Sequence, residues 1–146
     1  MNILADKGVL DVTDPLTKYF EDFDPVNPYD TEKGASAVTL ESLASQTSGL
    51  MRETPCGFVG ECTEELALSL GNIIPLLNCP LSRPHYSNFG FNLLGHACAK
   101  AAGADDNYEQ WIVDNILTPF NMSSSGFDYP EEVKEKMAVG CLFLYH

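Results

Sequence analysis

The sequence predicts a mainly α-helical chain, on the strength of three observations. Apolar residues recur at helical spacing in several segments, helix-capping residues stand at the starts of these segments, and strand signals are few. The clearest strand signal covers residues 138–145, which are apolar and rich in β-forming side chains. Helices are therefore expected to form most of the regular structure.

The first two helical segments are indicated by residues that favour helix ends. The N-terminal segment is typical of the last turns of a helix, because Lys7 and Gly8 suit a C-terminal end. A second helix is expected to begin at Asp14, with aspartate as the capping residue and Pro15 at the first helical position. Prolines and a glycine within residues 23–34 then predict an extended surface loop.

Threonines mark the starts of the next two helices. Thr39 precedes a short helix that is expected to end near Gly49, and Thr63 precedes a longer one. Apolar residues at helical spacing predict the face that each helix buries. They are Leu40, Leu43 and Ala44 in the first helix, and Leu66, Leu70 and Ile73 in the second.

Two further helices are expected in the C-terminal half. One runs from about Asn88 to Gly103, with its apolar residues in helical register. The other is capped by Asp106 and is stopped by Pro119.

The composition indicates a folded and strongly acidic chain. Its 146 residues suffice for one domain with a core of its own, and no apolar run approaches the roughly 18 residues that a membrane span requires. The formal net charge is -13, from 21 acidic and 8 basic side chains. Because an acidic surface repels phosphate groups, neither nucleic acid nor an anionic membrane surface is expected as a partner.

The cysteines and a glycosylation signal bear on location. There are five cysteines, so at least one is unpaired within the chain. Cys56 and Cys62 flank a short glycine-containing segment, and a disulfide between them is geometrically reasonable in an oxidising compartment. With the sequon at Asn121, this favours an extracytoplasmic or secreted location, and any signal peptide is expected upstream of Met1.

Zinc binding is the alternative use of the cysteines, with His85, His96 and Cys98 as further ligands. No Cys-x-x-Cys pair is present, and His96 and Cys98 lie two residues apart on an expected helix, so they point in different directions. No phosphate-binding glycine loop is present either. Neither a metal nor a cofactor is therefore expected.

Three stretches of the sequence occur in a fixed order: 39–50 reads TLESLASQTSGL, 84–95 reads PHYSNFGFNLLG, and 116–122 reads ILTPFNM. Together they resemble the serine β-lactamase-related family, which includes class C β-lactamases, penicillin-binding proteins and animal β-lactamase-like proteins. The chain departs from many relatives at Gln46, where they have histidine, and at Asn121, where glycine is common. The resemblance implies that residues 1–146 are the helical part of an α+β β-lactamase/transpeptidase-like domain, without most of its central antiparallel sheet.

The resemblance also implies roles for Tyr86 and Asn88. In such families a serine in Ser-x-x-Lys attacks the carbonyl, a tyrosine in Tyr-x-Asn transfers the proton, and a triad ending in glycine binds the substrate. Tyr86 would be the general base or acid and Asn88 the orienting residue, with Ser87 as a spacer. The alternative is that Ser87 or Asn88 caps the following helix, and both readings can hold at once.

Two of the three elements are absent from these residues. The sequence contains no Ser-x-x-Lys, and no Lys-Thr-Gly, Lys-Ser-Gly or His-x-Gly triad follows Tyr86. A phenol with an ordinary pKa of about 10 stays protonated at neutral pH, so Tyr86 is not expected to replace the two missing elements. The chain by itself is therefore expected to be inactive as a hydrolase.

Three hypotheses remain open from the sequence. The first is a serine hydrolase for amide, ester or peptide bonds, with its nucleophile upstream of Met1, its substrate-binding strand beyond His146, and a small-molecule or peptide substrate. The second is a non-catalytic binding or regulatory protein that retains the cleft wall around Tyr86, for a partner that the sequence does not identify. The third is a truncated product without function.

Overall fold

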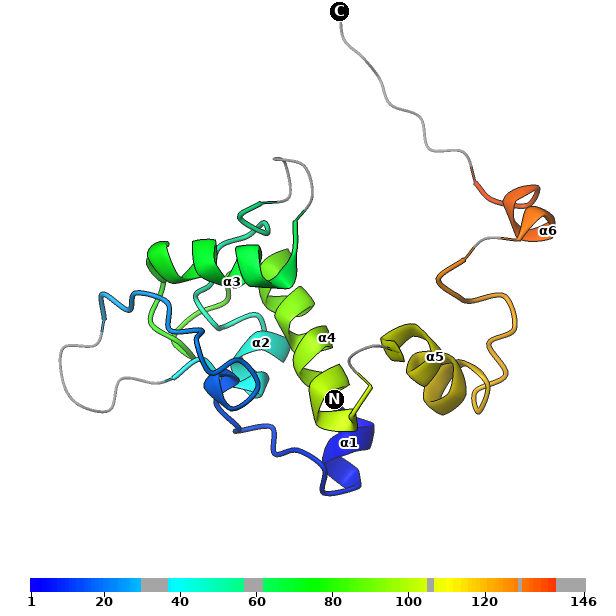
Figure 1. Ribbon diagram of the computed structural model, residues 1–146, viewed down its shortest axis with the longest axis horizontal. Coiled ribbons are helices and arrows are strands. Elements are labelled where there is room, and N and C mark those ends of the chain that lie inside the picture. Colours follow the sequence, from blue (N-terminus) through cyan, green and yellow to red (C-terminus); the bar gives the residue numbers. More distant parts are fainter. Residues whose placement is uncertain (30–36, 57–61, 105–106, 129, 139–146) are drawn as a thin grey trace, which may run out of the picture. The chain divides into compact units, whose positions relative to one another are not determined.

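The computed structural model describes residues 1–29, 37–56, 62–104, 107–128 and 130–138 (Figure 1). Its helices, in chain order, are α1 (Asn2–Asp6), η1 (Leu16–Lys18), α2 (Leu40–Ala44), α3 (Glu64–Ile73), α4 (Asn88–Ala102), α5 (Tyr108–Ile112), η3 (Val113–Leu117) and α6 (Glu131–Lys134). The described part contains no strand, which confirms the mainly helical class. Residues 139–145 of the expected strand lie outside the described residues.

The chain divides into two compact units, unit 1 (Met1–Asp105) and unit 2 (Asp106–His146). In unit 1, α4 packs against α2 and α1, and α2 lies beside the middle of α4 in Figure 1. The long helix α4 therefore forms the centre of unit 1.

The predicted threonine caps are confirmed. The backbone N–H of Ser42 donates to Thr39 Oγ1 at 3.2 Å, and that of Leu66 donates to Thr63 Oγ1 at 3.2 Å. The helix that Thr39 caps, α2, is shorter than expected, because Gln46 adopts a positive φ of 60° that a right-handed helix does not allow. It ends at Ala44 rather than near Gly49.

The predicted glycine ends are also confirmed. After α1, Gly8 has a φ of 67°, and after α4, Gly103 has a φ of 64°. Both angles lie in the left-handed region that glycine adopts without a steric cost. These two glycines thus fix where α1 and α4 stop.

The face that α3 buries differs from the prediction. Two residues of the expected apolar stripe, Leu66 and Ile73, are 38% and 71% exposed, whereas the buried residues of α3 are Ala67 and Gly71. At Gly71 an added Cβ would lie 2.9 Å from the ring of Phe23 and 3.1 Å from that of Phe89. The helix therefore turns its smallest residues inward, because two large rings occupy the space beneath it.

Phe23 and Phe89 are the largest fully buried side chains of the described part. Their ring centroids are 6.1 Å apart with an edge-to-face angle of 85°, a favourable geometry for aromatic pairs. Phe89 is the second residue of α4, and Phe23 lies in the segment after η1. The ring pair thus joins the start of α4 to the N-terminal part of unit 1.

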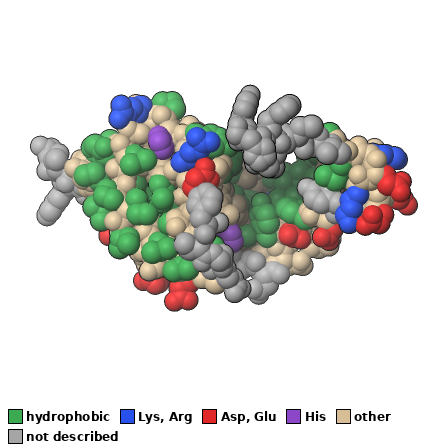
Figure 2. Space-filling view, turned by 90° about the horizontal axis from the view of Figure 1, so that it is seen from above, with side chains coloured by type: hydrophobic (Ala, Val, Ile, Leu, Met, Phe, Trp, Pro, Cys, Tyr) green, Lys and Arg blue, Asp and Glu red, His purple; other side chains and the backbone are tan. Residues whose placement is uncertain are grey.

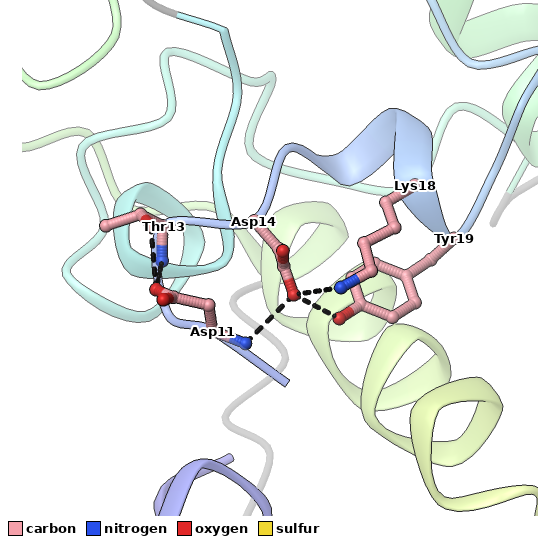
Figure 3. Close-up of polar contacts among 5 residues, drawn as sticks. All are labelled: Asp11, Thr13, Asp14, Lys18 and Tyr19. Carbon is pink, nitrogen blue, oxygen red and sulfur yellow. Dashed lines mark hydrogen bonds and ion pairs between the residues drawn. The ribbon is translucent and has the colours of Figure 1, made fainter. Parts of the chain in front are cut away.

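The helix expected from Asp14 is only a single 3-10 turn, η1, and Asp14 does not cap it. Its Oδ2 instead accepts three hydrogen bonds, shown in Figure 3: from Lys18 Nζ at 2.7 Å, Tyr19 Oη at 2.7 Å and the Asp11 backbone N–H at 2.9 Å. These donors lower the pKa of Asp14 to about 2, and Lys18 makes the largest contribution. Burial and the carboxylate of Asp14 raise the pKa of Tyr19.

Unit 2 consists of short helical pieces. Asn107 stands at the start of α5, whereas the expected cap, Asp106, lies outside the described residues. The helix continues as the π-helical η3 and ends before Pro119, as predicted. No residue of α5, η3 or α6 is buried. Within the part of the chain that the structure describes, no helix is long and apolar enough to cross a membrane.

Candidate functional site

Tyr86, Ser87 and Asn88 stand at the N-terminal end of α4, and Ser87 is the capping residue. Its buried Oγ accepts from the backbone N–H of Gly90 at 2.8 Å and donates to the carbonyl oxygen of Met51 at 2.6 Å. The alternative in which Ser87 caps the helix is therefore confirmed. The same hydroxyl also attaches α4 to the segment around Met51.

Asn88 is held by two residues that follow Met51. Its side-chain Nδ2 donates to Glu53 Oε2 at 2.9 Å, and its backbone N–H donates to the carbonyl oxygen of Arg52 at 2.7 Å. Glu53 is itself fixed, because Arg52 Nε donates to its other carboxylate oxygen at 3.0 Å. The carboxamide of Asn88 is thus oriented before any ligand binds.

Tyr86 is the exposed member of the motif. Its side chain is 60% exposed, so the phenol is open to solvent. The guanidinium carbon of Arg52 lies 5.7 Å from the centroid of its ring, within the range of a cation–π contact. The segment that orients Asn88 therefore also contacts Tyr86.

Gln46 binds the backbone on both sides of Tyr86. Its side-chain Oε1 accepts from the N–H of Ser87 at 2.6 Å, and its backbone carbonyl accepts from the N–H of His85 at 2.7 Å. The positive φ of Gln46, 60°, accompanies this arrangement. Gln46 thus fixes the backbone of the motif on both sides of Tyr86.

Sequence reasoning placed Tyr86 and Asn88 at the site, and the structure brings both to the start of α4. Sequence reasoning did not identify Arg52 and Glu53. The only available signal was their position directly after the TSGL stretch that ends at Leu50, because neither residue belongs to a catalytic pattern. Contacts across more than 30 positions of the chain are not visible in a local motif.

A second polar cluster lies further along α4. Glu64, the first residue of α3, contacts His96 Nδ1 at 2.9 Å and Lys100 Nζ at 2.8 Å. Lys100 also lies 4.7 Å from the ring centroid of Phe20. Both partners of Glu64 come from α4, so this cluster joins α3 to α4.

The proposed zinc ligands are not brought together. Among the residues that the structure describes, no group of three His, Cys, Asp or Glu side chains could hold a metal ion. His96 is engaged with Glu64, and Cys98 is a free, half-buried thiol. Nε2 of His85 is buried without a hydrogen-bond partner in the described part.

The predicted disulfide is present. Cys56 and Cys62 are bonded, with their Cα atoms 5.3 Å apart. Cys79, like Cys98, is a free thiol. Cys56 follows Glu53 closely, and Cys62 precedes the cap of α3. The bond therefore ties the segment that orients Asn88 to the start of α3.

Several large apolar side chains of unit 1 are exposed. Figure 2 shows hydrophobic side chains gathered on this face of unit 1, with few charged groups among them. Exposed hydrophobic residues in and around the two long helices include Leu66, Ile73, Leu77, Leu81, Tyr86 and Phe91. Unit 1 thus has an apolar surface as well as an acidic composition.

Comparison with known proteins identifies the class of fold. The structure is similar to a β-lactamase/D-alanine carboxypeptidase from Yersinia pestis, with a TM-score of 0.74 and 29% sequence identity over 93% of this chain and 39% of that chain. It is also similar to an octameric penicillin-binding protein homologue from Pyrococcus abyssi, with a TM-score of 0.63, 25% identity and coverage of 92% and 31%. The chain therefore has part of the β-lactamase and penicillin-binding protein fold.

Sequence comparison identifies the family. The chain is 37% identical to β-lactamase-like protein 2 of Dictyostelium discoideum over 95% of its length, and 34% identical to the putative β-lactamase-like 1 of Homo sapiens over 94%. It is 33% identical to the D-alanyl-D-alanine-carboxypeptidase/endopeptidase AmpH of Escherichia coli over 85%. The family model described as Beta-lactamase matches residues 1–140, and the chain belongs to this family.

The match covers only part of each relative. The chain spans 25% of the Dictyostelium protein, 28% of the human protein and 32% of AmpH. It therefore corresponds to a fragment of the fold that these proteins contain.

Proposed function

We propose that residues 1–146 are the helical part of a serine hydrolase domain of β-lactamase type, which cleaves an amide, ester or peptide bond through an acyl-enzyme. The observation that supports this most directly is the exposed Tyr86 beside an Asn88 whose carboxamide is already oriented by Glu53. The family membership supports the same reaction class. A small molecule or a peptide is the proposed substrate.

Each residue of the motif has a proposed role. Tyr86 transfers a proton between the attacking serine, the substrate and the leaving group, which requires a phenol that a substrate can reach. Asn88 orients the substrate with its side-chain oxygen, because its nitrogen is bound to Glu53. Ser87 and Gln46 hold the backbone of the motif.

The proposed nucleophile is a serine outside these residues. Because the chain contains no Ser-x-x-Lys, we propose that residues 1–146 alone do not form an acyl-enzyme. The intact mass of the natural polypeptide, compared with the 16.0 kDa of this chain, tests the point. A larger mass with a Ser-x-x-Lys upstream supports the hydrolase.

An acylation experiment tests the role of Tyr86. The isolated chain treated with a fluorophosphonate probe should show no adduct by mass spectrometry, whereas a polypeptide that also carries Ser-x-x-Lys should be acylated. In that polypeptide, Tyr86→Phe should slow acylation by about 100-fold or more, the usual size of a general acid–base contribution. Tyr29→Phe is the matched control, because Tyr29 is also exposed and its phenol donates to the carbonyl oxygen of Leu77, away from the motif. A stoichiometric adduct on the isolated chain would contradict the proposal.

The second candidate is a non-catalytic binding or regulatory protein, and the exposed apolar side chains of unit 1 favour it. Ile73, at 71%, and Phe91, at 50%, are examples of such residues on α3 and α4. A natural polypeptide of 16.0 kDa with a sharp, cooperative thermal transition would support this candidate. Binding of a hydrophobic dye without a transition would count against it.

A further inference from the structure

The chain contains a single N-glycosylation sequon, Asn121-Met122-Ser123, which the proposed function does not use. No other asparagine of the sequence is followed two positions later by serine or threonine. Met122 occupies the middle position of the sequon, where proline would prevent recognition. Asn121 is therefore the only asparagine of this sequence that meets the requirement for an asparagine-linked glycan.

The structure places Asn121 just after a helix end, in a turn that main-chain hydrogen bonds close. The N–H of Met122 donates to the carbonyl oxygen of Leu117 at 2.8 Å, and the N–H of Asn121 donates to that of Thr118 at 3.0 Å. This pair of bonds defines a Schellman motif, whose first residue beyond the helix is left-handed. Asn121 has the required positive φ, 52°, which asparagine adopts more readily than most residues. The turn therefore uses the backbone of Asn121 and leaves its side chain free.

The side chains that define the sequon are accessible. Asn121 and Ser123 are both exposed, and neither side chain makes a hydrogen bond to another described residue. The adjacent Phe120 and Met122 are also exposed, at 68% and 45%. A group attached to Nδ2 of Asn121 would thus point into solvent and would break no bond that stabilises the turn.

The disulfide between Cys56 and Cys62 is an independent observation that favours the same modification. Disulfides form and persist in oxidising compartments, which include the lumen of the endoplasmic reticulum. Asparagine-linked glycans are attached in that lumen. The disulfide belongs to unit 1 and the sequon to unit 2, so neither feature depends on the other. A chain that enters the lumen to form this bond also meets the enzyme that recognises the sequon.

We propose that Asn121 is an N-glycosylation site. In the modification, Nδ2 of Asn121 forms a bond to the anomeric carbon of a lipid-linked oligosaccharide pyrophosphate. The bond between this carbon and the pyrophosphate oxygen breaks, and the lipid pyrophosphate leaves with the bonding electron pair. The amide nitrogen loses one proton to a base, and nothing is oxidised or reduced. The enzyme that transfers the oligosaccharide belongs to the cell, and it recognises the hydroxyl of Ser123.

Peptide mapping of the natural polypeptide, purified from its source, tests the site. Treatment with peptide-N-glycosidase in heavy-oxygen water converts a glycosylated asparagine to aspartate that carries the heavy isotope. Asn121 should carry this label in most molecules, and a sample without the glycosidase should remain unlabelled. Asn107 and Asn115 lie in the same tryptic peptide, residues 101–134, and are internal controls that should stay unlabelled. An unlabelled Asn121 in the treated sample would overturn the proposal.

Variants of the natural polypeptide, secreted from a eukaryotic cell, test the dependence on the sequon. Ser123→Ala should abolish the gel shift that the glycosidase produces, whereas Ser123→Thr should retain it, because threonine also completes a sequon. Ser124→Ala is the matched control, because Ser124 is an exposed serine directly outside the sequon. A glycan that persists in Ser123→Ala would show that another site carries it. Neither experiment requires hydrolase activity, so the result is independent of the proposed function.

Discussion

Single polar side chains of this chain bond several groups at once. The hydroxyl of Ser87 both caps α4 and binds the carbonyl of Met51, and Asp14 accepts three hydrogen bonds on one carboxylate oxygen. Each group satisfies donors that would otherwise lack partners. The contacts that form the candidate site are of the same kind, since Gln46 and Glu53 reach α4 from a separate segment.

The carboxylate of Asp14 should make stability depend on pH. The pKa of Asp14 is about 2 in the folded chain, against an ordinary value of 3.8 that holds in the unfolded chain. The stabilisation by its carboxylate is therefore present above about pH 4 and is lost as the pH falls towards 2. Asp14→Asn should lower the free energy of unfolding by about 1 kcal/mol at pH 7 and reduce its change between pH 4 and 2. Urea unfolding across this pH range measures both effects.

Asp6→Asn is the control for this prediction, because Asp6 is exposed and accepts no side-chain hydrogen bond from the described residues. It should unfold with the pH dependence of the unchanged chain. An Asp14→Asn variant with an equally steep loss of stability below pH 4 would show that other groups cause it.

Local chemistry made some residue-level predictions succeed. Thr39 and Thr63 cap helices as expected, because a cap needs only a backbone N–H three residues later. Asp14 has the same capping chemistry, but Lys18 and Tyr19 take its carboxylate, so no cap forms. A sequence pattern identifies groups that can cap a helix and does not show which donor each group finds.

The helices of unit 1 show the same limit at the scale of elements. The ends of α1 and α4 were predictable, because Gly8 and Gly103 supply positive φ angles. The buried face of α3 was not, because its periodicity marks Leu66 and Ile73 while the rings of Phe23 and Phe89 admit only small residues. Which face of a helix is buried depends on the volume of its neighbours as well as on its own pattern.

Gly71→Ala should destabilise the chain although alanine is the better helix former. The propensity gain is about 1 kcal/mol, but the new methyl group would lie 2.9 Å from the buried ring of Phe23 and 3.1 Å from that of Phe89. Overpacking of a close-packed core costs about 1–3 kcal/mol, so a net loss of about 1 kcal/mol is expected in chemical denaturation.

Gly126→Ala provides the comparison for Gly71→Ala. An added Cβ at Gly126 would have its nearest contact at 3.7 Å, which is an ordinary van der Waals distance. Its unfolding free energy should change by less than about 0.5 kcal/mol. If Gly71→Ala is as stable as the unchanged chain or more so, the packing of α3 on the two rings is wrong.

At the scale of the whole molecule, the Cys56–Cys62 bond is the covalent link between the site segment and α3. Closing a loop of this length stabilises a folded chain by roughly 2 kcal/mol in the chain-entropy model. Reduction should therefore lower the unfolding free energy by about that amount. Peptide mapping after alkylation should find Cys56 and Cys62 modified only after reduction.

The free thiols Cys79 and Cys98 are the internal control, because both are half-buried and should react without reductant. The Cys56→Ser, Cys62→Ser double variant should match the stability of the reduced chain. Alkylation of Cys56 in the unreduced chain would contradict the disulfide.

The family was predictable from three stretches of the sequence, and the match of the family model over residues 1–140 confirms the family. The roles of Tyr86 and Asn88 stay predictions. Arg52 and Glu53 could not be found, because their link to α4 depends on how the chain folds back. Motifs reveal the ancestry of a site, whereas its supporting contacts require the fold.

The two hydrogen bonds of Gln46 have a consequence for recognition. They fix the backbone at His85 and Ser87, so the peptide that carries Tyr86 is immobilised when the chain folds. A ligand that binds at Tyr86 does not have to order this backbone. The entropic cost of that ordering, about 1–2 kcal/mol per residue, is therefore not subtracted from the free energy of binding. Recognition at Tyr86 should thus follow a lock-and-key course, with the same main-chain conformation before and after a ligand arrives.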